Sequence, residues 1–282
     1  MAILVVGNAV VDRIYRVPRL PVAGETLLAV EASRQFGGKG LNQAVIAARA
    51  GAAVTLLAAV GDDADGAAIA AHLAGEPLLA ELVHLPGPSD ESVVLVAEGG
   101  ENLIVSTAAR ARALPPASIE RALGAMRAGD LVLVQGNLAE ATTLDLLRAA
   151  GRRGLRRIAN AAPLAYAWDA LQAEVDLLVV NGVEAAQLGT LRSACVVVTA
   201  GAAGATLIEA GRRTRIEAPA VVAADTAGAG DVLCGVLVAL LDRGLAAEDA
   251  LAQAVRAASL KVGRSGTSAG LPTGRELAEL LA

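Results

Sequence analysis

The sequence predicts an α/β fold in which helices cover both faces of a mainly parallel central sheet, with a small β-sheet lid beside it. Three observations lead to this prediction. Residues 3–7 form a continuous apolar run, which is typical of a strand covered on both faces. From Pro115 onward, strand and helix patterns alternate, as they do in parallel sheets. Residues 91–106 have apolar runs on either side of the polar turn 98–102, which indicates a hairpin.

The elements are expected in the following order. After the first strand, residues 8–12 turn outward, and residues 25–32 form a strand within a small β excursion. The further elements are helices over 44–51, 65–75, 116–127, 140–152, 183–189, 246–263 and 273–281, and strands over 54–60, 131–135, 156–159, 176–180 and 195–199. The length of 282 residues fits one large domain or two small ones. Because no long linker or internal repeat occurs, we expect a single domain over 1–282, with a lid formed by 13–34 and 91–107.

Composition limits the classes of partner. Hydrophobic residues make up 55% of the chain, so a sizeable core is expected. The net charge of −5 and the scarcity of aromatic side chains argue against a nucleic-acid partner. Charged residues or glycines interrupt each apolar run before the length of about 18 that a membrane helix needs, so no membrane partner is expected. Two cysteines, Cys195 and Cys234, lie in apolar runs, and no basic leader precedes the first strand, so a cytoplasmic protein with reduced thiols is expected.

A glycine-rich stretch near the C-terminus suggests an anion site. Residues 225–231 read Asp-Thr-Ala-Gly-Ala-Gly-Asp and precede an apolar run with the length of a buried helix. Gly228, Ala229 and Gly230 let a ligand approach the backbone, and the start of a helix collects free N–H groups that bind anions. Asp231 would lie in the first turn and accept a proton from an attacking hydroxyl group, which points to phosphoryl transfer. The alternative is an ordinary turn before a helix that binds nothing.

A second glycine-rich stretch precedes an alanine-rich helix. Residues 36–43 read Phe-Gly-Gly-Lys-Gly-Leu-Asn-Gln and match neither a P-loop nor a dinucleotide fingerprint. The backbone N–H groups and the side-chain amide of Asn42 suit a hydroxylated ligand, and the alternative is a tight strand-to-helix turn that binds nothing. Asp12 follows the first buried strand, where open α/β sheets place ligand contacts. Its alternative is an ordinary turn or cap acid.

Acidic residues invite metal hypotheses at two places. Asn181 and Glu184 follow the buried run 175–180, where a strand gives way to a helix. There they can face one pocket and hold water molecules of Mg²⁺. The equal alternative is that they form the capping box of the helix. The acids within residues 62–65 do not match an EF-hand loop, and Asp65 is expected to cap the following helix instead.

Taken together, these residues resemble the ribokinase-like family of carbohydrate kinases, often called the PfkB family, and its ribokinase branch in particular. Residues 37–44, with Gly51 and Gly61 behind them, look like the N-terminal signature of that family. Residues 225–231, with Gly235, look like its C-terminal signature. The resemblance spans almost the whole chain, and both signatures lie at strand-to-helix junctions in the expected order.

The resemblance implies a role for each matching residue. Asp231 would be the general base, and the amides of Gly228, Ala229 and Gly230 would hold the γ-phosphate of ATP. The positions that match sugar contacts are Asp12, Gly38, Lys39 and Asn42. Asn181 and Glu184 match the Mg²⁺ positions, and Thr199, Gly201 and Gly204 match the segment that lines the nucleotide. In several relatives a monovalent cation, usually K⁺, binds mostly through backbone carbonyl oxygens, at positions that correspond to Asp225, Ala227, Arg264, Gly266 and Gly270. The lid often forms a dimer interface in such kinases, so a homodimer is expected.

Two departures from the family bear on specificity. Asn137 stands where ribokinases commonly carry a glutamate that reaches the sugar, and an amide can donate as well as accept. The segment between Glu184 and Cys195, beside the nucleotide, is short. The expected reaction is ATP-dependent phosphorylation of a primary hydroxyl group on a pentose, with D-ribose as the acceptor. The alternatives are a hexose-phosphate or nucleoside kinase, or a catalytically silent sugar-binding module on the same fold.

Overall fold

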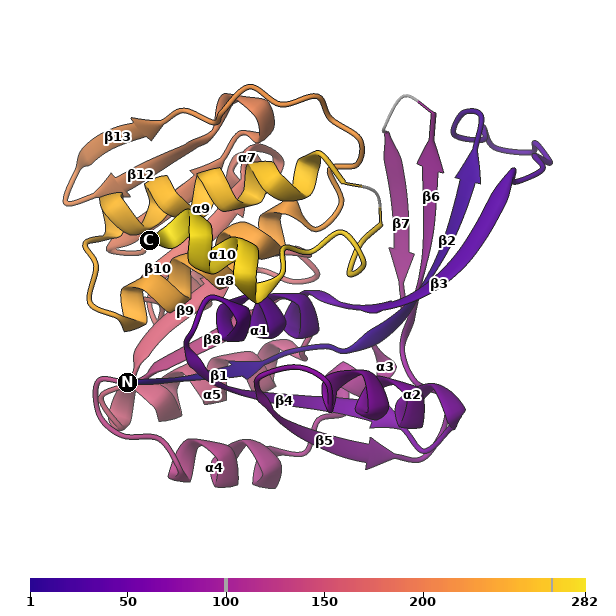
Figure 1. Cartoon of the computed structure of the whole chain (residues 1–282). Coiled ribbons are helices and arrows are strands. Elements are labelled where there is room, and N and C mark those ends of the chain that lie inside the picture. The colour runs from indigo at the N-terminus through magenta and orange to yellow at the C-terminus, as the bar shows by residue number, and fades with distance from the viewer. Residues whose placement is uncertain (99–100, 265) are drawn as a thin grey trace.

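The computed structural model describes residues 1–98, 101–264 and 266–282, and its largest element is a nine-stranded sheet (Figure 1). Across the sheet the strands are β13 (Arg212–Ile216), β12 (Ala205–Glu209), β11 (Cys195–Thr199), β10 (Leu177–Asn181), β9 (Arg156–Asn160), β8 (Leu131–Gln135), β1 (Ala2–Val6), β4 (Ala53–Gly61) and β5 (Leu79–Leu85). Neighbouring strands from β11 to β5 are parallel, and β12 and β13 run antiparallel at one edge.

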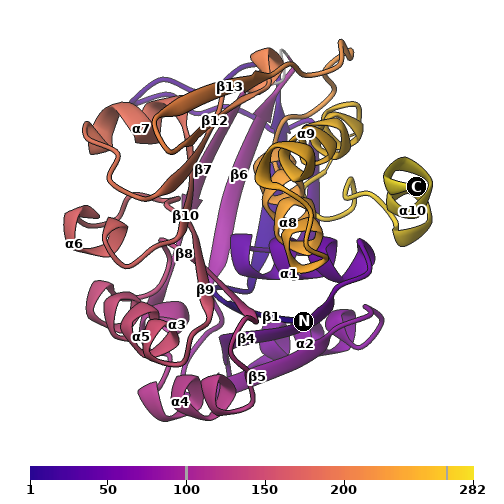
Figure 2. The same cartoon turned by 90° about the vertical axis from the view of Figure 1, so that its left-hand side faces the viewer.

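Helices cover both faces of this sheet, as Figure 2 shows edge-on. One face carries α1 (Lys39–Arg49), α2 (Ala64–Leu73), α8 (Ala229–Asp242), α9 (Ala247–Val262) and α10 (Gly274–Leu281). The other carries α3 (Ala109–Arg112), α4 (Pro116–Gly124), α5 (Glu140–Arg152), α6 (Asp169–Gln172) and α7 (Gly182–Leu188). Strand β1 is apolar throughout because both of its faces are buried. Ile3 and Val5 pack in the core on the first face, and Leu4 and Val6 pack in the core on the second.

A four-stranded lid stands beside the main sheet (Figure 1). Its strands, in spatial order, are β3 (Glu31–Gly37), β2 (Val10–Val17), β6 (Glu91–Ala97) and β7 (Asn102–Ser106). Both outer pairs are antiparallel, whereas β2 and β6 are parallel. Ile14, Val94 and Val96 form a small buried apolar cluster on this sheet.

The predicted fold class is confirmed, and so are several elements to the residue: the strands over 131–135 and 195–199 and the helix over 140–152. The predicted hairpin over 91–106 forms as β6 and β7, although residues 99–100 of its turn lie outside the described residues. Within those described residues, no helix combines the length and apolarity that crossing a bilayer requires.

The lid differs from the prediction in its boundaries. Residues 25–29 form no strand; the chain enters β3 only at Glu31, and β2 already begins at Val10, so Asp12 lies within a strand and not in a turn. The lid strands were hard to recognise because β3 carries the exposed polar residues Ser33 and Arg34. The same reason applies to the edge strand β13, which the sequence did not predict.

The predicted cap of α2 was assigned to the wrong acid. Asp63 is the N-cap residue, and its Oδ1 accepts a hydrogen bond of 2.7 Å from the N–H of Gly66. Asp65 lies in the first turn of the helix, where it forms ion pairs with Arg13 and Arg34 of the lid. These ion pairs connect α2 to the lid strands β2 and β3.

Candidate active site

Polar residues gather at the carboxyl edge of the parallel strands, and two of them, Asn181 and Thr199, were predicted as site residues from the sequence. Gln135, Asn160, Asn181 and Thr199 are the last residues of β8, β9, β10 and β11, respectively. In open α/β sheets, ligands bind at this edge. The amino ends of α1 and α8 lie at the same edge, because each helix follows a glycine-rich turn that leads from the sheet or the lid.

A close contact between α1 and α8 brings their first turns together. A Cβ atom at Gly235 would lie 2.6 Å from Cγ2 of Ile46 and 2.8 Å from the carbonyl oxygen of Gln43. Only glycine lets the two helices approach this closely at that point. The contact therefore explains why Gly235 belongs to the signature, and it places Asn42 and Gln43 beside the start of α8.

Asp231 is held by two side-chain amides. Its carboxylate is buried in the first turn of α8. Nδ2 of Asn42 donates to Oδ2 at 3.1 Å, and Nε2 of Gln43 donates to Oδ1 at 2.9 Å. Within the described residues, no cationic side chain forms an ion pair with Asp231. The carboxylate is therefore oriented by neutral donors, which leave it free to accept a proton.

Gln43 is itself fixed by a buried network of amides. Nε2 of Gln135 donates to Oε1 of Gln43 at 2.9 Å, and Nε2 of Gln43 also donates to Oδ1 of Asn160 at 3.2 Å. Nδ2 of Asn160 continues to the carbonyl oxygen of Val179 at 3.2 Å. The sequence showed Gln43 as part of a signature, but it gave no signal for Gln135 or Asn160. Their role depends on strands β8 and β9 being neighbours, which no local pattern reveals.

The turn before α8 has the backbone geometry of an anion site. Gly228 has a φ of 82°, a conformation that favours glycine. The N–H group of Ala229 donates to the carbonyl oxygen of Thr226 at 3.3 Å, whereas those of Gly228 and Gly230 form no hydrogen bond within the described residues. Beside Gly230 there is open space, because a Cβ atom there would meet nothing within 4 Å. Two of the three predicted N–H donors thus remain available to an anion, and the positive end of the α8 dipole lies behind them.

Asp12 approaches the same region from the lid. It is buried in β2, opposite Gln35 of β3, and its Oδ2 accepts a hydrogen bond of 2.8 Å from Oγ1 of Thr267. Burial raises the pKa of Asp12, and the charge of Asp231 raises it further, while the hydrogen bond from Thr267 lowers it. A Cβ atom at Gly37 would lie 2.2 Å from Oδ2 of Asp12, so the lid can hold this carboxylate only beside a glycine. No local pattern in the sequence indicates a role for Thr267.

The other predicted sugar contacts offer unused hydrogen-bonding groups. Asn42 and Asn137 are buried, and the Oδ1 atom of each has no hydrogen-bond partner within the described residues. Buried acceptors are nearly always satisfied, so a ligand with hydroxyl donors suits them. Gly38, with a φ of 98°, lies against the carbonyl oxygen of Asn8, and Lys39 follows as the first residue of α1, half-buried and without an ion-pair partner in the part of the chain described.

Asn181 and Glu184 form a capping box at the start of α7. Oδ1 of Asn181 accepts from the N–H group of Glu184 at 2.8 Å, and Oε2 of Glu184 accepts from that of Asn181 at 2.8 Å. The structural interpretation of this pair is therefore confirmed, and the Mg²⁺ role stays a prediction. The residues fit that ion as a single carboxylate that reaches solvent, since Mg²⁺ commonly binds one or two carboxylates together with substrate phosphates. Across the described residues, no cluster of three potential metal ligands occurs.

The predicted nucleotide positions lie along the end of β11 and the following turn. Thr199 is half-buried, and Gly201 begins an exposed 3₁₀ turn (Gly201–Ala203). Gly204 has a structural reason of its own, since a Cβ atom there would lie 2.0 Å from the carbonyl oxygen of Ile216. The glycine is needed for the close approach of the chain beside β13.

The predicted K⁺ positions are arranged around a lysine. Nζ of Lys261, a fully buried residue of α9, donates to the carbonyl oxygen of Asp225 at 3.2 Å and to that of Arg264 at 3.0 Å. The guanidinium group of Arg264 turns away to pair with Glu276. Burial lowers the pKa of Lys261, and the charge of Asp225 partly offsets this. The predicted K⁺ site does not fit this arrangement, because an ammonium group already uses two of the carbonyl oxygens that the ion would need. The remaining predicted K⁺ positions are Ala227, Gly266 and Gly270, which are all buried.

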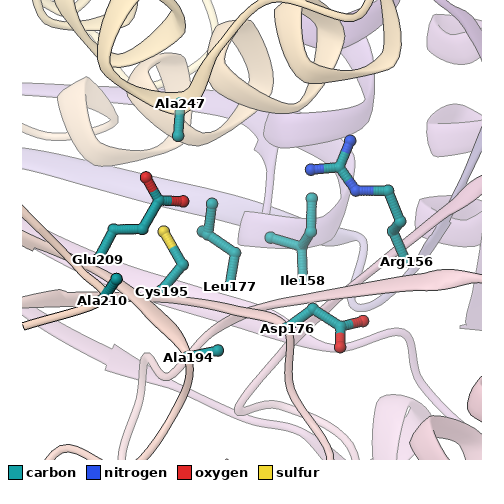
Figure 3. A pocket seen from close by; sticks show the side chains of 9 residues that line it. All are labelled: Arg156, Ile158, Asp176, Leu177, Ala194, Cys195, Glu209, Ala210 and Ala247. Atoms are coloured by element: carbon teal, nitrogen blue, oxygen red, sulfur yellow. The ribbon is translucent and has the colours of Figure 1, made fainter.

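A separate cavity of about 490 Å³ lies at the opposite edge of the sheet (Figure 3). It is lined by the first residues of β9 and β11, Arg156 and Cys195, and by Glu209 at the end of the antiparallel β12. The side chains of Cys195 and Glu209 point into the space below Ala247 of α9. Burial raises the pKa of Cys195 to about 11, so this thiol stays protonated. Because the cavity lies at the amino ends of the parallel strands, it is remote from Asp231 and does not belong to the candidate active site.

Known proteins resemble the chain along its whole length. Residues 2–274 match the family described as pfkB family carbohydrate kinase. The chain is 31% identical to the ribokinase of Bacillus subtilis over 290 residues, which cover 99% of each protein. It is 26% identical to the deoxyribokinase of Salmonella typhi over 100% of this chain and 99% of that protein. The structure of Arabidopsis thaliana ribokinase complexed with ribose and ATP matches with a TM-score of 0.81, at 25% identity over 99% of this chain and 98% of that one. The chain belongs to the pfkB family of carbohydrate kinases, and it is a ribokinase-type sugar kinase.

Proposed function

We propose that this kinase transfers the γ-phosphate of ATP to a primary hydroxyl group of a pentose, with D-ribose as its preferred acceptor. The observation that carries the proposal is the placement of Asp231. Its carboxylate is held by Asn42 and Gln43 at the start of α8, next to two N–H groups of the glycine-rich turn that form no hydrogen bond with any described residue. The relatives named above that act on ribose support the choice of acceptor.

In this proposal Asp231 is the general base. It accepts the proton of the acceptor hydroxyl as the hydroxyl oxygen attacks the γ-phosphorus and the bond to the bridging oxygen of ADP breaks. The amides of Gly228, Ala229 and Gly230 form the anion hole. The N–H groups of Gly228 and Gly230 carry most of this role, because that of Ala229 already has a partner. The α8 dipole adds to the stabilisation of the transferring phosphoryl group.

The acceptor would be held between the lid and the first turn of α1. Asp12 accepts from sugar hydroxyl groups, and Gly38, Lys39, Asn42 and Asn137 complete the contacts. Support comes from the buried Oδ1 atoms of Asn42 and Asn137, which have no hydrogen-bond partner among the described residues. Because Asn137 also carries a donor amide, it can hydrogen-bond a sugar oxygen that a glutamate would repel.

ATP would lie on the β10–β11 side of the carboxyl edge, along Thr199, Gly201 and Gly204. Glu184 and Asn181 would hold Mg²⁺ through its water ligands, and the ion would neutralise charge on the phosphates. The capping box keeps these two side chains at fixed positions at the start of α7, which supports the assignment.

We further propose a homodimer that forms through the lid, in a cytoplasmic protein. The outer face of the lid exposes Val93, Leu103 and Val105, and Val93 lies directly opposite Val105 in the β6–β7 pair. Exposed apolar patches of this kind commonly mark interfaces. Two free, buried cysteines suit a reducing compartment. Light scattering of the purified protein tests the dimer: a molar mass of one chain would contradict it.

A nucleoside acceptor is less well supported than a pentose. A nucleoside kinase gains affinity by stacking the base on aromatic rings, and this chain has four aromatic residues in total. Trp168 and Tyr166 stack on each other at a centroid distance of 5.8 Å, and Phe36 packs on His72. Three of the four rings are thus occupied within the protein.

A panel of acceptors tests the proposal. ADP release is measured with Mg²⁺ and D-ribose, 2-deoxy-D-ribose, fructose 6-phosphate and adenosine. We expect the highest kcat/KM with D-ribose. A higher kcat/KM with the hexose phosphate, the nucleoside or deoxyribose would contradict ribose as the preferred acceptor and identify that compound instead. If no acceptor releases ADP above the rate without sugar, the chain is a silent sugar-binding module.

A further inference from the structure

Lys261 has unusual surroundings for a charged residue. Its side chain is fully buried, and its ammonium group donates to two backbone carbonyl oxygens, those of Asp225 and Arg264. No carboxylate lies within ion-pair distance of it in the described part of the chain. A buried charge is costly unless polar groups surround it, so the carbonyl dipoles are its main compensation.

The ammonium group lies directly behind the turn that precedes α8. Asp225 opens that turn, and its carboxylate accepts from the N–H groups of Ala227 and Gly266, each at 2.9 Å. A Cβ atom at Gly228 would lie 3.6 Å from Cε of Lys261. Lys261 therefore connects the glycine-rich turn to the loop after α9, and it places a positive charge behind the N–H groups that are proposed to hold the phosphate.

The choice of lysine at this position is selective. Among the 24 basic residues of the chain, only Lys39 and Lys261 are lysines, and the ion pairs of the side chains elsewhere are made by arginine. An ammonium group is a compact point charge with three donors, whereas a guanidinium group is a planar fork that suits carboxylates. The ammonium group of Lys261 therefore resembles a small monovalent cation that is coordinated by carbonyl oxygens.

We propose that the ammonium group of Lys261 is a built-in substitute for the monovalent cation expected beside the anion hole, so that phosphoryl transfer by this protein does not depend on K⁺. Lys261 touches no reacting atom in this proposal. It is a positioning residue, because it fixes the carbonyl oxygen of Asp225 and thereby the turn that presents the N–H groups of Gly228 and Gly230. The inference rests on the kinase activity proposed above.

The first test uses the wild-type protein. Initial rates are measured in KCl, NaCl and choline chloride at one ionic strength, so that screening is constant. We expect the same rate in all three salts. A rate several-fold higher in KCl than in choline chloride would overturn the proposal, whatever the variants do.

The second test removes the ammonium group in two ways. Lys261→Ala leaves space beside the two carbonyl oxygens, and we expect turnover in choline chloride to fall by about 10- to 100-fold, as for the loss of hydrogen bonds from a charged group. KCl or NH₄Cl should restore most of this loss. Lys261→Met removes the charge but fills the space, so its turnover should be equally low and should not respond to K⁺. Lys261→Ala that is as active as the wild type without K⁺ would contradict the proposal.

Thermal unfolding gives a readout that needs no turnover. The Tm of Lys261→Ala should rise in KCl relative to choline chloride, because K⁺ binds the folded state at the vacated carbonyl oxygens. The Tm values of the wild type, of Lys261→Met and of the neighbouring control Val262→Ala should show no such difference. A Tm of Lys261→Ala that is the same in all salts would refute the cation site. A K⁺-dependent Tm without kinase activity would instead locate the failure in the proposed reaction.

Discussion

Replacing Gln43 by methionine tests how Asp231 is oriented. Methionine has nearly the same length and volume as glutamine, so the packing between α1 and α8 is retained while the amide is lost. The change removes the 2.9 Å hydrogen bond to Oδ1 of Asp231 and, of the side chains described, leaves only Asn42 to hold the carboxylate. It also leaves Gln135 and Asn160 without their Gln43 partner.

The size of each effect follows from the usual energies of the hydrogen bonds that are lost. A hydrogen bond to a charged group contributes about 1.5–3 kcal/mol, which corresponds to a fall in kcat of about 10- to 100-fold if the bond matters fully in the transition state. The KM for ribose should change little, because Gln43 contacts Asp231 and not the predicted sugar contacts. Nε2 of Gln135 and Oδ1 of Asn160 lose their hydrogen bonds to Gln43, and each loss should lower the free energy of unfolding by about 1–3 kcal/mol.

The assay compares Gln43→Met with a matched control, Gln172→Met. Gln172 is also a buried amide, which accepts from the N–H group of Arg192 at 2.9 Å, but it lies on α6, away from Asp231. Both variants should unfold at a lower temperature than the wild type, and only Gln43→Met should lose kcat. If Gln43→Met retains normal kcat while it is destabilised to the same extent as the control, Gln43 is a structural residue only.

Two further predictions concern the acceptor side. Because burial raises the pKa of Asp12, the KM for ribose should begin to rise at a higher pH than an ordinary aspartate would require, as the pH falls and the carboxylate is protonated. The same raised pKa means that Asp12 stabilises the fold most below its unfolded pKa and loses this as the pH rises through the folded one. Asp12→Asn should therefore bind ribose poorly, show a flat pH profile of KM and be at least as stable as the wild type at neutral pH; a pH profile like that of the wild type would rule out Asp12 as its source. Asn137→Glu should shift the preference among sugars and leave the KM for ATP unchanged, and an unaltered acceptor profile would remove Asn137 from the sugar site.

The buried strands could be predicted because burial on both faces leaves an apolar pattern in the strand's own sequence. A parallel strand covered on both faces is apolar along its buried length, and residues 131–134 and 195–198 show this directly, before each strand ends in a polar residue. The lid and edge strands obey no such rule, since residues such as Ser33 and Arg213 face solvent. Their pairing is decided by neighbours that are distant in the sequence.

Some residues of the candidate site could likewise be predicted from a local sequence pattern, and others could not. Asp231 and Asn42 lie in glycine-rich turns before helices, and these turns have a recognisable sequence because the backbone needs small residues there. Thr267 meets Asp12 across 255 positions, and Gln135 meets Gln43 across 92. Lys261 reads in the sequence as one basic residue near the end of a helix, and only the folded chain shows that its ammonium group takes carbonyl oxygens assigned to an ion.

The central claim is that Asp231 is the base that accepts the proton of the acceptor hydroxyl. Asp231→Asn keeps the size of the side chain and an oxygen that can accept from Asn42 or Gln43, but the amide cannot take up a proton. The most direct measurement is the kcat of this variant with ribose and MgATP, together with ribose affinity by calorimetry. We predict that kcat falls by at least about 10²-fold while the affinity for ribose stays close to that of the wild type. Turnover near the wild-type rate would contradict the account.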